Sequence, residues 1–261
     1  MPVGLSIGPL LRLARQSSGP LEPAGPLVVL GPLAPQLSRA LAEGGDASLV
    51  RPDGEPAGAG VLVCVLAGGP SAEQLRVLRA AARAGTPRVA VQTGAPADVP
   101  YVLARDVVDC PPGRGFPVER IAGAIARAAG PAGAALAARL PALREPVVRA
   151  LVARSALRAA AIAAVPWVHG SHLPLLLPLQ ARTIREALTA TGAPERELPL
   201  PAAAPVRPEF GLALAVGLAG RSLARALPHG GVPVRAAIAG GVTLAIGALA
   251  ATPGLLTQRR S

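Results

Sequence analysis

Short apolar runs separated by glycine and proline organise the amino-terminal half of the chain. The clearest runs are Leu27–Gly31, Val61–Leu66 and Arg88–Gln92, and weaker ones lie at 48–50 and 105–110. Continuous apolar runs of this length, rich in valine, are typical of strands that are buried on both faces of a sheet. We therefore expect five strands between residues 27 and 110.

Helical periodicity fills the spaces between several of these strands. Helices are expected over 34–43, from Ser71 to Gly85 and over 117–129, with Gln74 completing a capping-box pattern on Ser71. Strands and helices that alternate at this spacing predict a parallel, Rossmann-like sheet with covering helices, an α/β fold.

The carboxyl-terminal half follows a different pattern, because residues 159–181 contain no charged side chain. We expect a helix from Pro146 that breaks at Pro166, then a second helix that opens at Pro174 and carries Gln180 on its apolar stripe. The pattern predicts an all-α apolar domain of about four helices over 146–256.

The last apolar segment, 236–256, is uncharged and long enough to cross a bilayer, and Arg235 and Arg259–Arg260 flank it. Gly240 and Gly247 fall on one face, where they would permit close helix contact. Abundant alanine makes the segment only marginally hydrophobic. A central helix buried in a globular bundle fits the same pattern.

Charge is unevenly distributed along the chain. All 26 basic residues are arginine and the formal net charge is +11. Residues 1–145 carry 14 Arg and 11 acidic residues, a net charge of +3, whereas residues 146–261 carry 12 Arg and 4 acidic residues, a net charge of +8. Arginines that flank apolar runs suit an anionic lipid surface. A solvated basic rim on a helical bundle explains them equally well.

Nucleic-acid binding is disfavoured because the basic residues lie in an apolar setting and aromatic residues make up only 2% of the chain. Cys64 and Cys110 are expected to be buried, reduced thiols. His169 and His172 have no carboxylate or cysteine nearby, and His229 is the only other histidine. A zinc site needs three or four ligands, so no metal site is predicted.

Loops at the carboxyl ends of strands are where an α/β sheet binds ligands. Gly31–Pro35 lacks the glycines, the lysine and the hydroxyl residue of a phosphate-binding loop, and proline removes N–H donors at positions 32 and 35. Ala67–Ser71 fits a small anion nest but also a simple turn, and Gln92–Val99 and Cys110–Phe116 carry no evident chemistry. We predict no catalytic, cofactor-binding or metal-binding residue, and no cofactor.

The amino-terminal half resembles the P-loop GTPase domains of the Era-like type. Residues 106–111, followed by Gly113, Gly115 and a helix from Val118, are similar to the family's last strand, final guanine-contacting loop and last helix. Gln92-Thr93-Gly94 occupies the place of the Asn-Lys-x-Asp base-reading motif, without its Lys or Asp. The resemblance covers 27–129 and implies a degenerate relative that binds no nucleotide.

The carboxyl-terminal half resembles the uncharacterised apolar helical domains that follow Era-like GTPase domains in many bacterial proteins. The pattern covers about 147–252: an Ala-rich helix, Val165-Pro166, Leu173-Pro174, Leu179-Gln180 and a helix that ends at Thr191-Gly192. Val168-His169-Gly170 and Thr191 depart from the family's Pro-x-Pro-Gly and Tyr-Gly. The resemblance implies membrane association without an established activity.

These observations predict an organisation in five parts: an amino-terminal segment (1–26), a degenerate nucleotide-binding-like α/β domain (27–130), a linker (131–145), an apolar helical domain (146–256) and a basic tail (257–261). The expected function is non-enzymatic and membrane-associated, with the α/β domain cytoplasmic, a membrane lipid or membrane protein as partner, and homo-oligomerisation left open. The alternative is a soluble regulator or enzyme that binds a nucleotide or small ligand at the strand ends.

Overall fold

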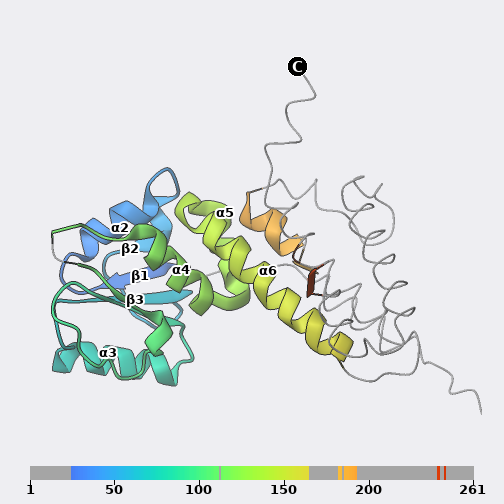
Figure 1. The fold of residues 1–261 in the computed structure, drawn as a ribbon. Helices are drawn as coiled ribbons and strands as arrows, with labels where there is room; N and C mark the ends of the chain where they lie inside the picture. The colour runs from blue at the N-terminus through green and yellow to red at the C-terminus, as the bar shows by residue number, and fades with distance from the viewer. Residues whose placement is uncertain are drawn as a thin grey trace, which may run out of the picture. The chain divides into compact units, whose positions relative to one another are not determined.

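The computed structural model describes residues 25–111, 113–164, 182–183, 185–192, 240–241 and 244 (Figure 1). The chain divides into two units. The α/β unit comprises residues 21–150 and 189–192, and the second unit comprises residues 1–20, 151–188 and 193–261.

The α/β unit is built on a five-stranded sheet with the strand order β2-β1-β3-β4-β5, in which every pair of neighbours is parallel. Its strands are β1 (Leu27–Leu30), β2 (Val50–Arg51), β3 (Val61–Leu66), β4 (Arg88–Gln92) and β5 (Val107–Asp109). This order is one of the two common doubly wound arrangements. The predicted α/β fold with a Rossmann-like parallel sheet is therefore confirmed.

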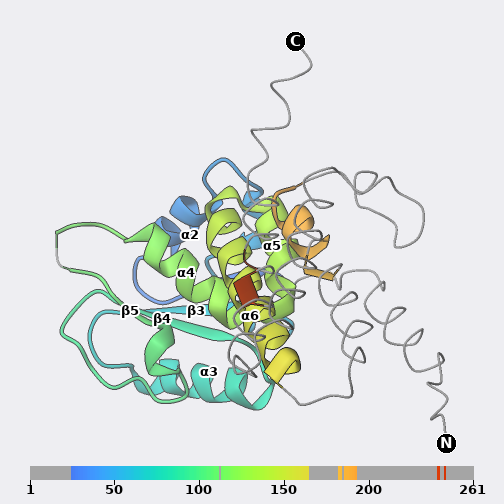
Figure 2. The ribbon, with the colours of Figure 1, turned by 45° about the vertical axis from the view of Figure 1, so that its right-hand side comes forward.

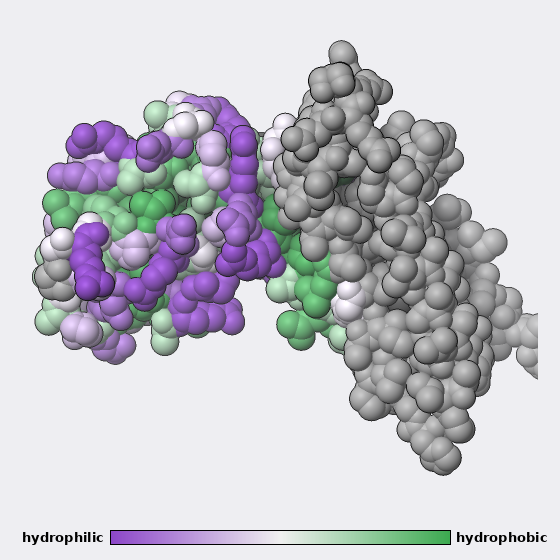
Figure 3. Space-filling model, turned by 45° about the horizontal axis from the view of Figure 1, so that its top comes forward, coloured by the Kyte–Doolittle hydropathy of each residue, from purple (hydrophilic) through white to green (hydrophobic). Residues whose placement is uncertain are grey.

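Helices cover the two faces of the sheet unequally (Figures 1 and 2). One face packs against α2 (Ala34–Ala42) and α4 (Val118–Ala129), and the opposite face packs against α3 (Ala72–Arg83). Ser71 caps α3 through the expected capping box with Gln74. Over the visible face of this unit, hydrophilic and hydrophobic residues are interspersed (Figure 3).

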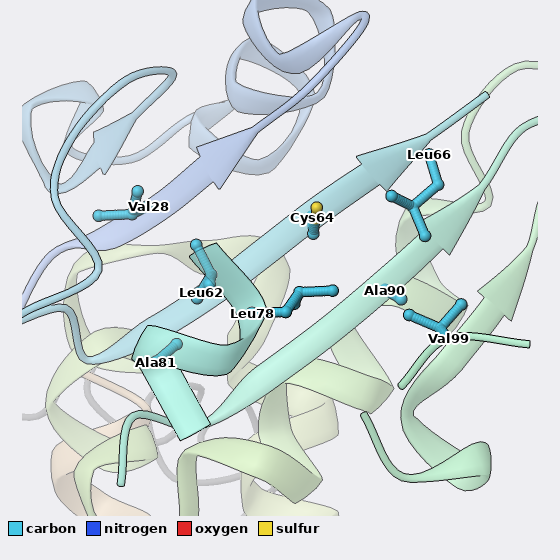
Figure 4. Packing of buried hydrophobic residues seen from close by; sticks show 8 residues of the cluster. All are labelled: Val28, Leu62, Cys64, Leu66, Leu78, Ala81, Ala90 and Val99. Atoms are coloured by element: carbon cyan, nitrogen blue, oxygen red, sulfur yellow. The ribbon is translucent and has the colours of Figure 1, made fainter. Parts of the chain in front are cut away.

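The core beneath α3 is a cluster in which side chains of the helix rest on alternate residues of three strands (Figure 4). Its members are Val28, Leu62, Cys64, Leu66, Leu78, Ala81, Ala90 and Val99. Successive residues of a strand point to opposite faces, so the remaining strand residues face α2 and α4. They are Leu27, Val29, Val50, Val61, Val63, Val65, Val89, Val91 and Val108, and all are buried.

Two of the four connections between strands contain no α-helix. Residues 52–60 join β2 to β3, and residues 93–106 join β4 to β5 with one 3-10 turn, η2 (Ala104–Asp106). A Cβ added to Gly54 would contact the Val28 side chain, which places the first loop over the α3 face. Val99 of the second loop belongs to the core under α3. Loops therefore take the place of helices on that face.

The stretch expected as a linker, 131–145, is helical and packed in the structure. It contains α5 (Gly133–Arg139) and the start of α6 (Pro141–Ala164), and Leu136, Leu140 and Leu143 are buried. The helix predicted to begin at Pro146 begins at Pro141, so Pro146 lies inside it. Proline removes one helical hydrogen bond, but burial of apolar side chains on this helix offsets that loss.

Within the second unit, the described residues pack closely around α6. Thr183 donates a buried hydrogen bond from Oγ1 to Oγ of Ser155 at 2.8 Å, and Arg182 pairs with the buried Glu186 at 2.7 Å. The helix over residues 185–190 continues from this unit into residues 189–192 of the α/β unit, and Gly192 has a φ of 77°, which confirms the helix end expected there.

Several expectations fall on residues outside the described part of the chain. These are the break at Pro166, the inward position of Gln180, Gly247 and most of segment 236–256. Gly240 lies near α6, where an added Cβ would be 3.7 Å from the Ala156 carbonyl oxygen and so has room. Among the described residues, no helix combines the length and the apolar character needed to cross a membrane.

Candidate functional site

The carboxyl edge of the sheet is where a doubly wound fold binds ligands, at the point where strand order reverses, here between β1 and β3. Gly31 follows β1 with a φ of 105°, and a Cβ there would overlap the carbonyl oxygen of Val65 in β3. Gln74 reaches over from α3 and donates from Nε2 to the same Val65 carbonyl at 3.2 Å. The chain's own backbone and the Gln74 amide therefore occupy this crevice.

The turn from β1 into α2 presents few donors to an anion. Pro32 and Pro35 have no N–H group, and Ala34 N donates to the Gly31 carbonyl at 3.2 Å. Leu33 adopts the left-handed conformation with a φ of 62° and makes no side-chain cap, while its side chain is 46% exposed.

The turn from β3 into α3 uses its donors internally. Ser71 N donates to Gln74 Oε1 at 2.9 Å, and Gln74 N donates to Ser71 Oγ at 3.2 Å. Glu73 places a carboxylate in the first turn of the helix, where it interacts favourably with the positive helix end and repels an anion. The geometry fits the simple turn expected over 67–71.

The loop after β4 is held against the end of β3. Thr93 donates to the Leu66 carbonyl from its backbone N at 2.8 Å and from Oγ1 at 3.2 Å. A Cβ on Gly94 would lie 3.0 Å from Ala67 C and Gly68 N. The backbones of the two loops are therefore in close contact.

Gln92 is the last residue of β4 and begins the segment Gln92-Thr93-Gly94. Its side chain is 2% exposed and donates from Nε2 to the Ala97 carbonyl at 2.7 Å. Its backbone carbonyl accepts from Cys110 N at 2.7 Å. The amide thus holds its own loop in place.

Both cysteines are buried, as the sequence predicts, and neither forms a disulfide. Burial raises the pKa of the Cys64 thiol to about 11. Burial also raises the pKa of Cys110, against the lowering effect of the Arg120 charge. A thiol reacts as its thiolate, so a raised pKa makes each of these a weak nucleophile.

Asp106 is a buried carboxylate that sequence patterns did not single out. Its Oδ1 lies 3.4 Å from Arg127 Nε on α4 and its Oδ2 lies 3.8 Å from Arg105 Nε. Arg127 Nη2 also donates to the Arg105 carbonyl at 2.7 Å. The group ties the end of the β4–β5 loop to α4, which is a structural role.

The residues that the structure describes contain no cluster of three or more His, Cys, Asp or Glu that could hold a metal ion. His169, His172 and His229 lie outside those residues. The chain matches no family model, no curated protein and no solved structure.

A shallow hollow of about 470 Å³ lies against α3 and is lined by Arg79, Ala82, Arg83 and Tyr101. Arg88, the first residue of β4, donates a hydrogen bond to the Tyr101 carbonyl, so the hollow is near the amino end of that strand and not at the carboxyl edge of the sheet. Tyr101 belongs to the β4–β5 loop and has a φ of 70°. A bulky residue in the left-handed region is an outlier. The sequence did not indicate this site, because it joins a helix to a loop about 20 residues away.

Proposed function

We propose that the chain is a non-enzymatic, membrane-associated protein. Its α/β unit is a nucleotide-free relative of GTPase-like domains that serves as a scaffold. Residues 146–256 form an apolar helical domain that holds the protein at the membrane, with the α/β unit on the cytoplasmic side. The partner is a membrane lipid or a membrane protein.

The observation that carries the proposal is the state of the crevice between β1 and β3. Gly31 lies against the Val65 carbonyl and Gln74 donates to it. A nucleotide phosphate needs several free N–H groups at this place, and this chain has two prolines there and no lysine. Because the chain's own residues occupy the place where a phosphate would bind, a scaffold role is favoured for this unit over nucleotide binding.

Support for the membrane comes from charge and apolar surface. Residues 146–261 hold 12 Arg and 4 acidic residues around apolar segments, and arginine near apolar segments favours the cytoplasmic face of a membrane. In the second unit, the side chains of Leu157 and Leu244 are 73% and 50% exposed. Exposed leucines, one of them next to Arg158, suit contact with lipid.

The nucleotide half of the proposal is tested by calorimetry of the purified full chain with GTP and with ATP, each with Mg²⁺. We expect no heat of binding and no hydrolysis. Micromolar binding of either nucleotide would favour the alternative, a soluble regulator or enzyme that uses the strand ends.

The membrane half is tested by fractionation. We expect the full chain in the membrane fraction, resistant to carbonate if the helical domain is inserted, and released by high salt if the attraction is electrostatic. A chain ending at Ala150 keeps the buried Val147 and Val148 of the α/β unit, and we expect it in the soluble fraction. A soluble, monomeric full chain at low salt without detergent would contradict the proposal.

A further inference from the structure

Tyr101 is held over the hollow by two arginines from different elements. Arg79 on α3 donates from Nε to the Tyr101 hydroxyl at 3.0 Å, and its guanidinium carbon lies 5.6 Å from the ring centroid. Arg88 on β4 donates from Nε to the Tyr101 carbonyl at 2.7 Å and from Nη1 to the Thr86 carbonyl at 2.9 Å. These contacts keep the residue in its unfavourable left-handed conformation, and backbone outliers of this kind cluster at binding sites.

The surface around the hollow carries positive charge without internal compensation. Arg76, Arg79 and Arg83 are exposed along α3. Within the described ranges, no carboxylate lies within 4.0 Å of these three guanidinium groups or that of Arg88. Arg79 uses its Nε for Tyr101, and among the described residues its two terminal nitrogens and the Arg83 guanidinium have no hydrogen-bond partner and are available to an anion. A guanidinium recognises phosphate oxygens by paired hydrogen bonds.

Apolar side chains stand beside this charge. Tyr101 is 41% exposed and Leu103, two residues further along the same loop, is 59% exposed. An aromatic ring with a polar tip, an exposed leucine and long arginine stems are the residue types that occupy a membrane interface. A soluble anion would gain nothing from the leucine, whereas a lipid surface offers phosphate and apolar contact together.

We propose that this hollow binds the phosphate group of an anionic membrane lipid. Arg79 and Arg83 contact the phosphate, and Tyr101 and Leu103 enter the headgroup layer. The assignment of the source to a lipid rests on the proposed membrane association. It adds a second contact, through the α/β unit, to the one proposed for the helical domain.

The chain contains one tyrosine and one tryptophan, so each unit can report separately. In the full chain with Trp167→Phe and Tyr101→Trp, the introduced indole reports on the hollow, and in the unaltered chain Trp167 reports on the helical domain. We expect phosphatidylcholine vesicles containing phosphatidylglycerol to blue-shift the emission of the indole at position 101. Brominated lipid in those vesicles should quench it, and vesicles of phosphatidylcholine alone should give less of both effects.

A double substitution tests the role of the two arginines. We expect Arg79→Gln with Arg83→Gln to weaken binding to the anionic vesicles by roughly thirtyfold, since each basic residue near the surface strengthens binding by about fivefold. The matched control is Arg39→Gln with Arg51→Gln, an equal change of charge at exposed positions on α2 and β2. An effect equal to that of the control would overturn the proposal.

The remaining outcomes separate the two proposals. If Trp167 responds to vesicles while the indole at position 101 stays in water, the hollow does not bind lipid and the membrane proposal stands. If neither responds, both fail. Millimolar inorganic phosphate that binds the wild-type chain, with no binding to vesicles, would overturn the lipid source.

Hydrogen exchange of the wild-type chain avoids any effect of the Tyr101 substitution on folding. We expect protection of residues 98–106 on anionic vesicles, and unchanged exchange there would contradict the proposal.

Discussion

The two faces of the α/β sheet are covered in different ways. On one face, α2 and α4 bury the strands under side chains such as Ile121 and Ile125, both fully inaccessible. On the other face, α3 is the one α-helix, and loops 52–60 and 93–106 complete the cover. Leu30 and Val102 are only partly buried there, and Tyr101 and Leu103 are exposed.

The composition of the strands follows this difference. The face under α2 and α4 is almost entirely valine, whereas the face under α3 carries Leu62, Cys64, Leu66 and Ala90. Loops are thinner than helices and leave polar backbone near the surface. The comparison therefore separates a face covered by two helices from a face covered partly by loops, which carries the arginines and the hollow.

The first prediction compares a fully buried isoleucine on one face with an exposed leucine on the other, and it has the largest expected effect. Ile125→Ala on α4 should lower the free energy of unfolding by about 3 kcal/mol, since it leaves a cavity in a packed core. Leu103→Ala should change it by less than about 0.5 kcal/mol. Urea unfolding measures both values, and similar losses at the two sites would show that the faces are equally packed.

The stability of the protein at alkaline pH tests whether Cys64, in the core under α3, is shielded from water. The folded-state pKa is raised from 9.0 to about 11, so the folded chain holds its proton where the unfolded chain has lost it. The stabilisation is present below pH 9 and is lost as the pH rises to 11, by about 2 to 3 kcal/mol. Lysine, which would titrate in this range, is absent from the chain.

The measurement for this prediction is urea unfolding at several pH values between 8 and 11. Cys64→Ala is the control, because it removes the titrating thiol, and its stability should fall less over the same range. An equal fall in both proteins would assign the effect to another group.

A middle-sized effect is expected at Val99, which is buried in the β4–β5 loop. Val99→Ala should cost about 1 to 2 kcal/mol, near the transfer free energy of the lost methyl groups, because a loop can relax into the space. A cost above that of Ile125→Ala would mean that the loop is as rigid as a helix. Thermal unfolding of the two variants side by side provides this comparison.

The smallest effect concerns the start of α3. Ser71→Ala removes the acceptor for Gln74 N and should cost about 1 kcal/mol. Gln74→Glu keeps a carboxyl oxygen for Ser71 N but loses the donor to the Val65 carbonyl. If Gln74→Glu is the more destabilising, the contact in the crevice matters more than the cap; chemical denaturation distinguishes the two.

Much of the α/β unit follows from local sequence. Strands β3 and β4 have the predicted bounds because their apolar runs end at glycine, proline or threonine, and the α3 capping box forms as its spacing indicates. Predicted strand 105–110 is shorter, since residues 104–106 form a 3-10 turn that buries Asp106 against Arg127. That partner is 21 residues away, and local patterns contain no information about it.

The start of helix α6 and the hollow were not predicted, for related reasons. Proline is typical of the first turn of a helix, so Pro146 was expected to start one. Leu143 and Val147 are buried in the packed unit, and their burial stabilises a helix that continues through Pro146. The hollow depends on Tyr101 and Arg79, which come together only when the loop folds over α3. Tertiary contacts decided both, and they override local preference.

An all-parallel sheet also constrains the order in which the chain folds. No neighbouring strands form a hairpin, so every pairing closes a long loop before it gains contacts, and such topologies fold slowly. Pairing of β3 with β4 through α3 has the longest register, from Leu62 with Arg88 to Leu66 with Gln92. We expect this β-α-β segment to nucleate the fold, with Leu78→Ala slowing refolding and Leu37→Ala on α2 mainly accelerating unfolding. Equal φ-values at the two positions would indicate instead that the whole unit condenses in one step.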